Sequence, residues 1–410
     1  MTNNNQHIPS GYKSSSLGII PEEWEVKRLG EVCINNGDYG LNAPATDYDE
    51  DLPTYLRITD IDDDGKFNQS EKKSVNSPLS ENYYLKDGDI VFARTGATVG
   101  KTYLYDKNDG ELVYAGFLIK FTPNKEIILP YFLKSQTNTR EYANWVSITS
   151  QRSGQPGINA AEYCSYKLAL PPLLEQKHIC DLLSLWDTAI AKQTALIEKL
   201  TLRKRGLMQK LLTGKKRLKG FEGEWKEVRL GDIFNERNET NRGDLPLLSI
   251  TGDKGVIYQS ESDKRDISNE DKTKYKRICP NDIGYNTMRM WQGRSALSEL
   301  EGIVSPAYTI VIPKNNVDVR FMAMFIQQPR IVYGFWTHSQ GLVRDTLNCK
   351  YPDFCQVKVT IPAKEEQTAI ADFFVEIDKE IEIQKQKLAA MQEQKKGLMQ
   401  VLLTGKRRIK

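Results

Sequence analysis

Residues 174–213 read LEQKHICDLLSLWDTAIAKQTALIEKLTLRKRGLMQKLLT, and this stretch decides the fold. Its apolar residues recur at alternating steps of four and three, which is the 3.5-residue repeat of a coiled-coil face. The stretch is therefore predicted to be one long helix that packs against another helix. We call the positions of this repeat the first seam: Ile179, Leu183, Trp186, Ile190, Gln193, Ile197, Leu200, Lys204, Leu207 and Leu211.

The same ladder returns 191 residues downstream, which indicates an internal duplication. Both copies end on Gly-Leu-Met-Gln-x-Leu-Leu-Thr-Gly-Lys, at residues 206–215 and 397–406. The polar positions Gln193 and Lys204 return as Gln384 and Lys395. The second seam consists of Ile370, Phe374, Ile377, Ile381, Gln384, Leu388, Met391, Lys395, Leu398 and Leu402.

The duplication extends beyond the helices to segments that are typical of strands and short helices. Surface loops between these segments share little, so the two halves have one scaffold and different surfaces. The paired segments predict a strand entering a short helix (24–32 and 225–233), a β-run (53–58 and 246–250), a strand start (89–90 and 282–283), one apolar strand stopped by proline (112–123 and 303–313), a short helix (130–140 and 320–328) and a last strand (166–170 and 356–361).

The predicted fold class is α+β, with two similar mixed α/β globular domains separated by two long antiparallel coiled-coil helices and related by an internal pseudo-two-fold repeat. Each helix leaves its globular domain almost at once, so two helices that pack on each other must run antiparallel. The expected parts are a first globular domain at 1–171, a central helix at 172–214, a second globular domain at 215–362 and a C-terminal helix at 363–410.

Gln193 and Gln384 lie near the midpoints of their helices, where an antiparallel pair would bring them together. We expect them to hydrogen-bond and fix the register of the helix pair, as a lone buried polar layer can. Replacing both with leucine should then raise the melting temperature of the protein. A lower melting temperature would count against this role.

Composition excludes several classes of protein. The chain has 410 residues and a net charge of +3, which is too small to indicate nucleic-acid binding alone. No window of 18 uncharged apolar residues occurs, so we expect a cytoplasmic protein without a membrane segment. Six cysteines without a Cys-x-x-Cys pair, together with three histidines, predict reduced thiols and no metal site. Cations follow both long helices, at 215–219 and 406–410, where they suit either a helix C-terminus or a phosphate contact.

Three segments are similar to catalytic motifs, and each departs from its motif. Residues 95–102 read TGATVGKT, but the phosphate-binding loop needs four residues between its glycines and a helix after it, whereas here three residues intervene and a strand is predicted next. The acidic and basic residues from Asp64 to Lys73 are typical of a solvated loop. Pro171-Pro172 lacks the neighbours that a base-methylating enzyme uses. We therefore predict no catalytic residues.

The remaining class of function is molecular recognition, because the loops of both halves combine cationic, amide and aromatic side chains. Arginine, glutamine and asparagine can bond in pairs to base edges, while lysine mainly meets phosphate. The candidate DNA-contacting residues are Arg57, Arg94, Thr95, Lys101, Thr102, Gln151, Arg152 and Gln155 in the first half, and Lys254, Arg289, Trp291, Gln292, Arg294, Gln340 and Arg344 in the second.

Over essentially its whole length the sequence resembles the specificity subunits of type I restriction-modification systems. The resemblance rests on 8–13 (IPSGYK) and 17–21 (LGIIP) with Trp24, on 55–61 (YLRITDI) and 94–101 (RTGATVGK), on the Glu-Gln pair that opens each long helix, and on both helix endings. The second half departs from this pattern at 248–252, which lack the arginine, and at 288–291, where MRMW replaces TGAT.

This resemblance implies a non-catalytic DNA-binding subunit. Each globular part would be a target recognition domain that reads one half of a split, asymmetric double-stranded DNA site. The helices would set the distance between the half-sites and dock two DNA-methyltransferase subunits, and a restriction and translocation subunit would join them. S-adenosylmethionine, ATP and Mg²⁺ would belong to those partners. Alternatives are a modification-only complex without a nuclease, an enzyme acting in its own right, and a coiled-coil scaffold that does not bind DNA.

Overall fold

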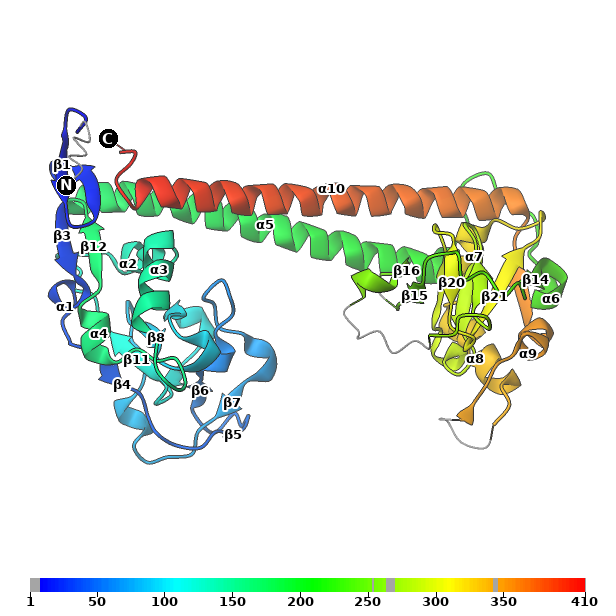
Figure 1. Cartoon of the computed structure of the whole chain (residues 1–410), viewed down its shortest axis with the longest axis horizontal. Coiled ribbons are helices and arrows are strands. Elements are labelled where there is room, and N and C mark those ends of the chain that lie inside the picture. The colour runs from blue at the N-terminus through cyan, green and yellow to red at the C-terminus, as the bar shows by residue number, and fades with distance from the viewer. Residues whose placement is uncertain (1–7, 253, 263–269, 342–345, 410) are drawn as a thin grey trace. The chain divides into compact units, whose positions relative to one another are not determined.

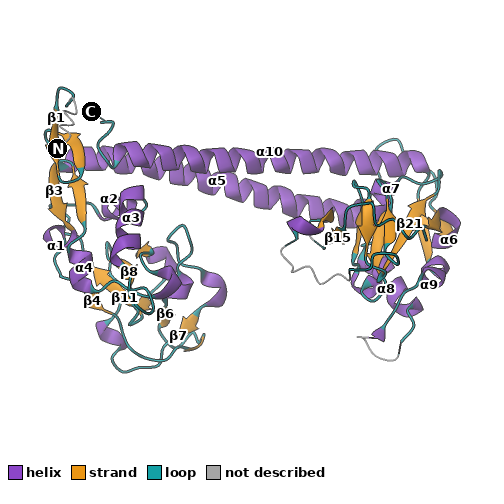
Figure 2. Ribbon diagram, in the orientation of Figure 1, coloured by secondary structure: helices purple, strands orange, loops and turns teal. Residues whose placement is uncertain are grey.

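A computed structural model describes residues 8–252, 254–262, 270–341 and 346–409. The chain divides into two compact units. Unit 1 comprises residues 1–194 and 387–410, and unit 2 comprises residues 195–386. Both units contain short strands, short helices and part of the two long helices (Figures 1 and 2).

In its described residues, unit 1 contains two four-stranded sheets and two two-stranded ribbons. One ribbon pairs β1 with β2 and the other pairs β3 with β12, both antiparallel. The sheets have the strand orders β4-β11-β8-β9 and β10-β6-β7-β5. The strands are β1 (Tyr12–Ser15), β2 (Gly18–Pro21), β3 (Glu25–Arg28), β4 (Asp38–Tyr39), β5 (Thr46–Asp47), β6 (Thr54–Leu56), β7 (Lys73–Ser74), β8 (Ile90–Ala93), β9 (Thr102–Leu104), β10 (Leu112–Tyr114), β11 (Leu118–Phe121) and β12 (Lys167–Leu170), and the short α-helices are α1 (Leu29–Val32), α2 (Pro130–Gln136), α3 (Arg140–Thr149) and α4 (Ala160–Cys164).

Unit 2 repeats this framework. The ribbon β13–β22 corresponds to β3–β12, and the sheet β14-β21-β18-β19 has the order of β4-β11-β8-β9. The remaining strands form two antiparallel pairs, β15–β16 and β17–β20. The strands are β13 (Lys226–Arg229), β14 (Phe234–Glu236), β15 (Leu248–Ile250), β16 (Val256–Tyr258), β17 (Lys276–Ile278), β18 (Ile283–Asn286), β19 (Ser295–Leu297), β20 (Gly302–Val304), β21 (Tyr308–Pro313) and β22 (Lys358–Ile361), and the short α-helices are α6 (Leu230–Ile233), α7 (Val319–Phe325), α8 (Pro329–His338) and α9 (Tyr351–Gln356).

The prediction of one apolar strand at 112–123 and at 303–313 is wrong in both halves. Each segment is two strands, because a tight turn reverses the chain between them. In unit 1 the turn is closed by Leu118 N donating to Ala115 O at 2.8 Å, and in unit 2 by Tyr308 N donating to Ser305 O at 3.0 Å. The two strands of each segment therefore pair with different partners: β10 lies against β6, and β11 lies against β8.

The two long helices are α5 (Leu173–Leu211) and α10 (Lys364–Leu402). Every position of the two predicted seams is buried or partly buried, whereas the positions between seam residues in 376–397 are exposed. Burial thus follows the 3.5-residue period that the sequence predicts.

Ion pairs within each unit show that the helices run antiparallel, as predicted. In unit 1 the late residue Lys395 of α10 bonds to the early residue Asp187 of α5. In unit 2 the late residue Lys204 of α5 bonds to the early residue Asp378 of α10. Lys204 and Lys395 are the two polar seam positions, so each is accommodated by a carboxylate on the facing helix.

The Glu-Gln pair at the start of each long helix joins the helix to its unit. Gln176 is fully buried, accepts from Leu129 N at 2.9 Å and donates to Pro171 O at 2.9 Å. Gln367 does the same with Asp318 N at 3.0 Å and Pro362 O at 2.8 Å. Because these amides satisfy backbone groups that would otherwise be buried without partners, they fix where each helix begins.

The preceding glutamate binds the cationic tail of the other helix. Glu175 accepts from Trp24 Nε1 at 3.0 Å and from Arg408 at 2.8 Å, and Glu366 accepts two bonds from Arg217. Arg217 and Arg408 are therefore occupied within the fold. The partner of each arginine is a glutamate at the start of the other long helix, which neither interpretation of the cations after the helices predicted.

Gln193 is buried and Gln384 is partly buried. Their proposed register role stays a prediction. None of the helices in the described residues combines the length and the apolar character needed to cross a lipid bilayer.

Candidate nucleic-acid interface

The turn between β8 and β9 corresponds to the turn between β18 and β19. Ala93 N donates to Lys101 O at 2.8 Å, and Asn286 N donates to Arg294 O at 3.1 Å. Lys101 and Arg294 thus occupy the same place in the two scaffolds. In both turns a single 3₁₀ turn leads into a strand, and no α-helix N-terminus is present to hold the phosphates of a nucleotide.

Lys101 is paired with an acidic turn. Its ammonium lies 2.7 Å from Asp63 Oδ1, and the Asp63 side chain is 96% exposed. The hydrogen bond from Lys101, followed by its positive charge, holds the pKa of Asp63 below its ordinary value. Lys101 is itself half-buried, so the carboxylate covers one side of a cation at the surface of unit 1.

Three other candidates in unit 1 are engaged inside the protein. Arg57 forms two bonds to the buried Asp60, at 2.9 and 2.6 Å, and Arg152 forms two to Glu162, at 2.6 and 2.7 Å. Thr102 is buried, and its hydroxyl lies 2.7 Å from that of Thr137. The burial of Thr102 argues against a contact with DNA, and the two arginines could reach DNA only by giving up their carboxylates.

The remaining candidates in unit 1 form a cluster beside the β8–β9 turn. Arg94 lies over the ring of Tyr39, 4.8 Å from its centroid. Thr95 forms a β-bridge with Gly157, and this bridge holds the exposed segment 151–156 against the turn. Gln151 and Gln155 are exposed on this loop. The structure thus brings together Arg94, Thr95, Gln151 and Gln155, from segments more than fifty residues apart.

In unit 2, four candidates line one cavity of about 610 Å³. It opens where the β15–β16 turn, the β18–β19 turn and the start of β21 meet. Its polar lining combines cations, amides and a phenol, a set suited to base edges and phosphates. The polar and cationic lining residues are Thr251, Lys254, Ser262, Asn286, Arg289, Gln292, Arg294 and Tyr308.

The other candidates of unit 2 are not part of this cavity. Trp291 is partly buried and donates to Met288 O at 3.0 Å. Gln340 is exposed and donates to Asp353 at 3.2 Å. Arg344 lies outside the described residues.

A buried lysine beside Lys101 was not predicted from the sequence. Lys134, on α2, is 8% exposed, and together with Lys101 it lines a cavity of about 280 Å³. Burial, reinforced by the charge of Lys395, lowers the pKa of Lys134 to about 8. The equivalent position on α7 is Ala323, because the preceding caps Leu129 and Asp318 bond to the equivalent glutamines.

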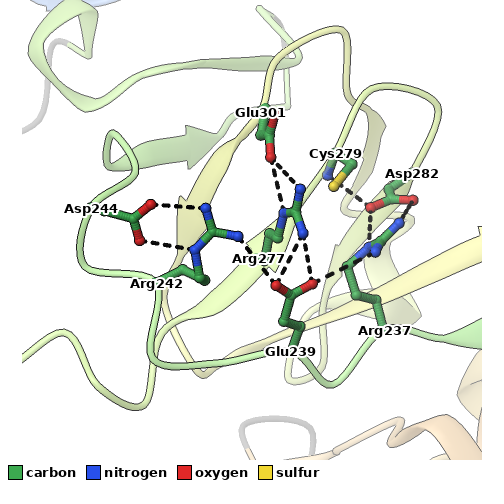
Figure 3. A network of polar contacts seen from close by, with 8 residues as sticks. All are labelled: Arg237, Glu239, Arg242, Asp244, Arg277, Cys279, Asp282 and Glu301. Atoms are coloured by element: carbon green, nitrogen blue, oxygen red, sulfur yellow. Dashed lines mark hydrogen bonds and ion pairs between the residues drawn. The ribbon is translucent and has the colours of Figure 1, made fainter.

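Unit 2 also contains a network of ion pairs in which three arginines take part (Figure 3). Arg277 bonds to Glu239 at 2.9 Å and to Glu301 at 3.0 Å, and Arg242 bonds to Asp244 at 2.8 Å. Arg237 bonds to Asp282 at 2.7 Å. These cations are satisfied by carboxylates and are not candidates for binding an anion.

Asp282 and its counterpart Asp89 hold equivalent turns. Cys279 N donates to Asp282, and Lys86 N donates to Asp89, both at 2.8 Å. The second partner differs: it is Arg237 in unit 2 and the hydroxyl of Thr122, at 2.6 Å, in unit 1. In the described part of the chain, no group of three or more His, Cys, Asp or Glu residues is placed to hold a metal ion.

The fold and these surfaces define a duplicated α+β protein in which one scaffold presents two different sets of polar loop residues. Residues 21–202 and 222–393 match the type I restriction modification DNA specificity domain. The chain belongs to this family.

Relatives match along nearly the full length. Two proteins of Methanocaldococcus jannaschii, named as the specificity subunits of type I restriction enzymes MjaX and MjaVIII, are 28% and 24% identical to the chain. The alignments cover 97% of the chain and 97% of the MjaX protein, and 95% and 94% for MjaVIII.

Solved structures share the fold. A chain from a structural study of complex assembly and conformational transition in the type I system has a TM-score of 0.59 at 18% identity, covering 95% of this chain and 99% of that one. The specificity subunit of Thermoanaerobacter tengcongensis has a TM-score of 0.50 at 17% identity, covering 95% and 98%.

Proposed function

We propose that the chain is the DNA sequence-specificity subunit of a type I restriction-modification complex. Each unit binds one half of a bipartite, asymmetric site on double-stranded DNA. The observation that carries this proposal is that equivalent positions of one scaffold hold different recognition chemistry. Lys101 is paired with the carboxylate of Asp63, whereas Arg294 forms no ion pair with any described residue and lines a polar cavity.

The long helices are proposed to dock two DNA-methyltransferase subunits. Apolar side chains lie outside the seams and are strongly exposed: Leu185 at 66%, Leu202 at 69% and Ile383 at 61%. Exposed leucines and isoleucines on a charged helix are typical of a surface that another protein covers.

The chemistry of the complex is assigned to the partners. The chain itself supplies no catalytic group, while adenine methylation and DNA cleavage by the complex depend on its binding to DNA. S-adenosylmethionine, ATP and Mg²⁺ are expected on the methyltransferase and on the restriction and translocation subunit. Purification of the complex from cells tests whether the nuclease is present or the complex only modifies DNA.

A test uses one substitution in each unit. The complex with methyltransferase subunits is assembled with the wild-type chain, with Arg94→Ala and with Arg289→Ala, and methylated sites are mapped by sequencing. Arg94→Ala should relax or weaken one half-site and Arg289→Ala the other. The proposal fails if methylation does not require the chain, or if each substitution alters both half-sites equally.

A further inference from the structure

We infer that Arg294 reads a guanine base in the half-site bound by unit 2. This inference rests on the proposed function and adds to it the identity of one base and of the residue that recognises it. It depends on three observations in the described part of unit 2: the position of the Arg294 guanidinium, the absence of a carboxylate bonded to it, and the polar residues that line the cavity beside it.

The guanidinium of Arg294 lies beside the turn between β15 and β16, and the side chain is exposed. Arg294 follows Gly293, whose positive φ of 73° turns the chain into β19. A Cβ added to Gly252 would lie 2.3 Å from Arg294 Nη1. The free end of the Arg294 side chain therefore lies close to Gly252, on the turn between β15 and β16.

The guanidinium has no carboxylate partner. Among the described residues, the arginines Arg57, Arg152, Arg237, Arg242 and Arg277 each form an ion pair, but Arg294 and its cavity neighbour Arg289 form none. Its planar set of donors is thus available to a pair of acceptors. Guanine presents such a pair in the major groove, as O6 and N7, and arginine bonded to both is the commonest specific contact of protein with DNA.

The surroundings fit a base edge better than a phosphate alone. Besides the cations Lys254 and Arg289, the cavity beside Arg294 is lined by Asn286, Gln292 and Tyr308, which can donate and accept hydrogen bonds. A phosphate offers only acceptors and needs no such mixture. At the equivalent position of unit 1, Lys101 is a point charge, which suits phosphate.

Substitution by lysine distinguishes the two contacts. The complex with methyltransferase subunits is prepared with wild-type chain, Arg294→Lys and Arg294→Ala, and its site is first determined by mapping methylation. Affinity is then measured for DNA in which each guanine of the unit 2 half-site is replaced in turn by 7-deazaguanine, which lacks the N7 acceptor.

If Arg294 reads guanine, both variants should weaken specific binding by about 5- to 150-fold, the range for a good pair of bonds to a base. One 7-deazaguanine should weaken wild-type binding, and the same replacement should cost Arg294→Ala little more. If Arg294 meets phosphate, Arg294→Lys keeps near wild-type affinity and 7-deazaguanine acts equally on all three proteins. That result, or a unit 2 half-site without guanine, overturns the inference.

Gly252→Ala provides a second variant that leaves Arg294 in the chain. The added methyl group occupies the place of Nη1, so the guanidinium must move, and the response to 7-deazaguanine should fall as in Arg294→Ala. Lys101→Ala, which removes the cation at the equivalent position of unit 1, is the matched control and should leave the response to 7-deazaguanine in the unit 2 half-site unchanged. Failure of the proposed function has a different signature, because the wild-type complex would then show no sequence-specific binding.

Discussion

At the scale of single residues, the ion pair of Lys101 with Asp63 has a measurable consequence for DNA binding. Asp63→Asn removes a negative charge from the proposed interface and leaves the Lys101 ammonium available to a phosphate. We expect tighter binding of DNA by the assembled complex and a steeper salt dependence, by about 0.9 in the logarithmic slope for one added phosphate contact.

The measurement is a salt titration of DNA affinity. Asp64→Asn is the control, because it makes the same change in charge at the neighbouring exposed residue, for which the structure shows no ion pair. Weaker binding by Asp63→Asn would instead show that the carboxylate positions Lys101 for its contact.

Lys134 links stability to pH. Burial lowers its pKa to about 8, below the ordinary value of 10.5, so the folded protein binds fewer protons than the unfolded chain between these values. The cost of burying the charge is complete below about pH 8 and disappears as pH rises toward 10.5. Lys134→Met should therefore be more stable at pH 7, by up to roughly 3 kcal/mol.

Urea denaturation at several pH values tests this expectation. The difference in unfolding free energy between Lys134→Met and the wild type should shrink from pH 8 to pH 10. A difference that does not vary with pH would show that Lys134 has the same pKa in the folded protein as in the unfolded chain. Ala323 at the equivalent position of α7 shows that the scaffold does not require a lysine here.

The residue chemistry could be predicted from the sequence only in part. Arg94, Lys101 and Arg294 were singled out, and the structure places all three at or beside the equivalent turns. Arg152 was expected to be available for DNA, but Glu162 lies beside it only after the chain has folded. The ion pair of Arg57 could have been predicted from the sequence, because its partner Asp60 is three residues away. Lys134 gave no signal, since its burial depends on the packing of α2.

At the scale of secondary-structure elements, equivalent aspartates hold the turns before β8 and β18 with different partners. Asp282→Asn leaves the guanidinium of Arg237 without its closest charge in a largely buried site, so we expect a loss of about 3 kcal/mol. In Asp89→Asn the amide oxygen can still accept the equivalent backbone hydrogen bond, and the second partner is only the hydroxyl of Thr122. We therefore expect the free energy of unfolding to fall by about 1 kcal/mol.

Thermal and urea denaturation of the two variants test this contrast directly. The two substitutions are chemically identical and lie at equivalent places, so their difference reports the partner alone. Equal losses would show that the backbone bond dominates at both turns and that the network of Figure 3 adds little to stability.

The long elements were predicted well and the short ones less well. Each seam repeats the same spacing of apolar residues over ten positions, so the observed helices α5 and α10 agree closely with the helices predicted from the sequence. The segments at 112–123 and 303–313 carry continuous apolar character, which hides the turn inside each. The helices α3 and α8 were also missed as separate elements, because each follows another helix after a break of three residues.

At the scale of the whole molecule, the paired helices are proposed to set the separation of the half-sites. Deleting one heptad from each helix, residues 194–200 and 385–391, preserves the phase of both seams. The pair becomes shorter by about 10 Å at 1.5 Å per residue, which corresponds to about three base pairs. We expect the accepted spacer to shorten by about this amount, with both half-sites unchanged.

Mapping of methylated sites in cells that carry the deleted chain tests this prediction. A four-residue deletion from each helix is the control, because it breaks the phase of the seams and should destabilise the protein. An unchanged spacer, or an altered half-site, would contradict the role of the helices as a spacer.

Unit 1 joins the two ends of the chain, and this has a consequence for its synthesis. Its core contains Trp24 and Leu29 together with Met399, Leu402 and Leu403, and its buried Glu175 binds Arg408. A ribosome therefore completes unit 2 before it has made the last part of unit 1. The N-terminal part of unit 1 therefore lacks its last core residues, and exposes the apolar surface that they cover, until translation is nearly complete. A message truncated before codon 399 would thus yield a protein whose earlier-made half is the one that is incomplete.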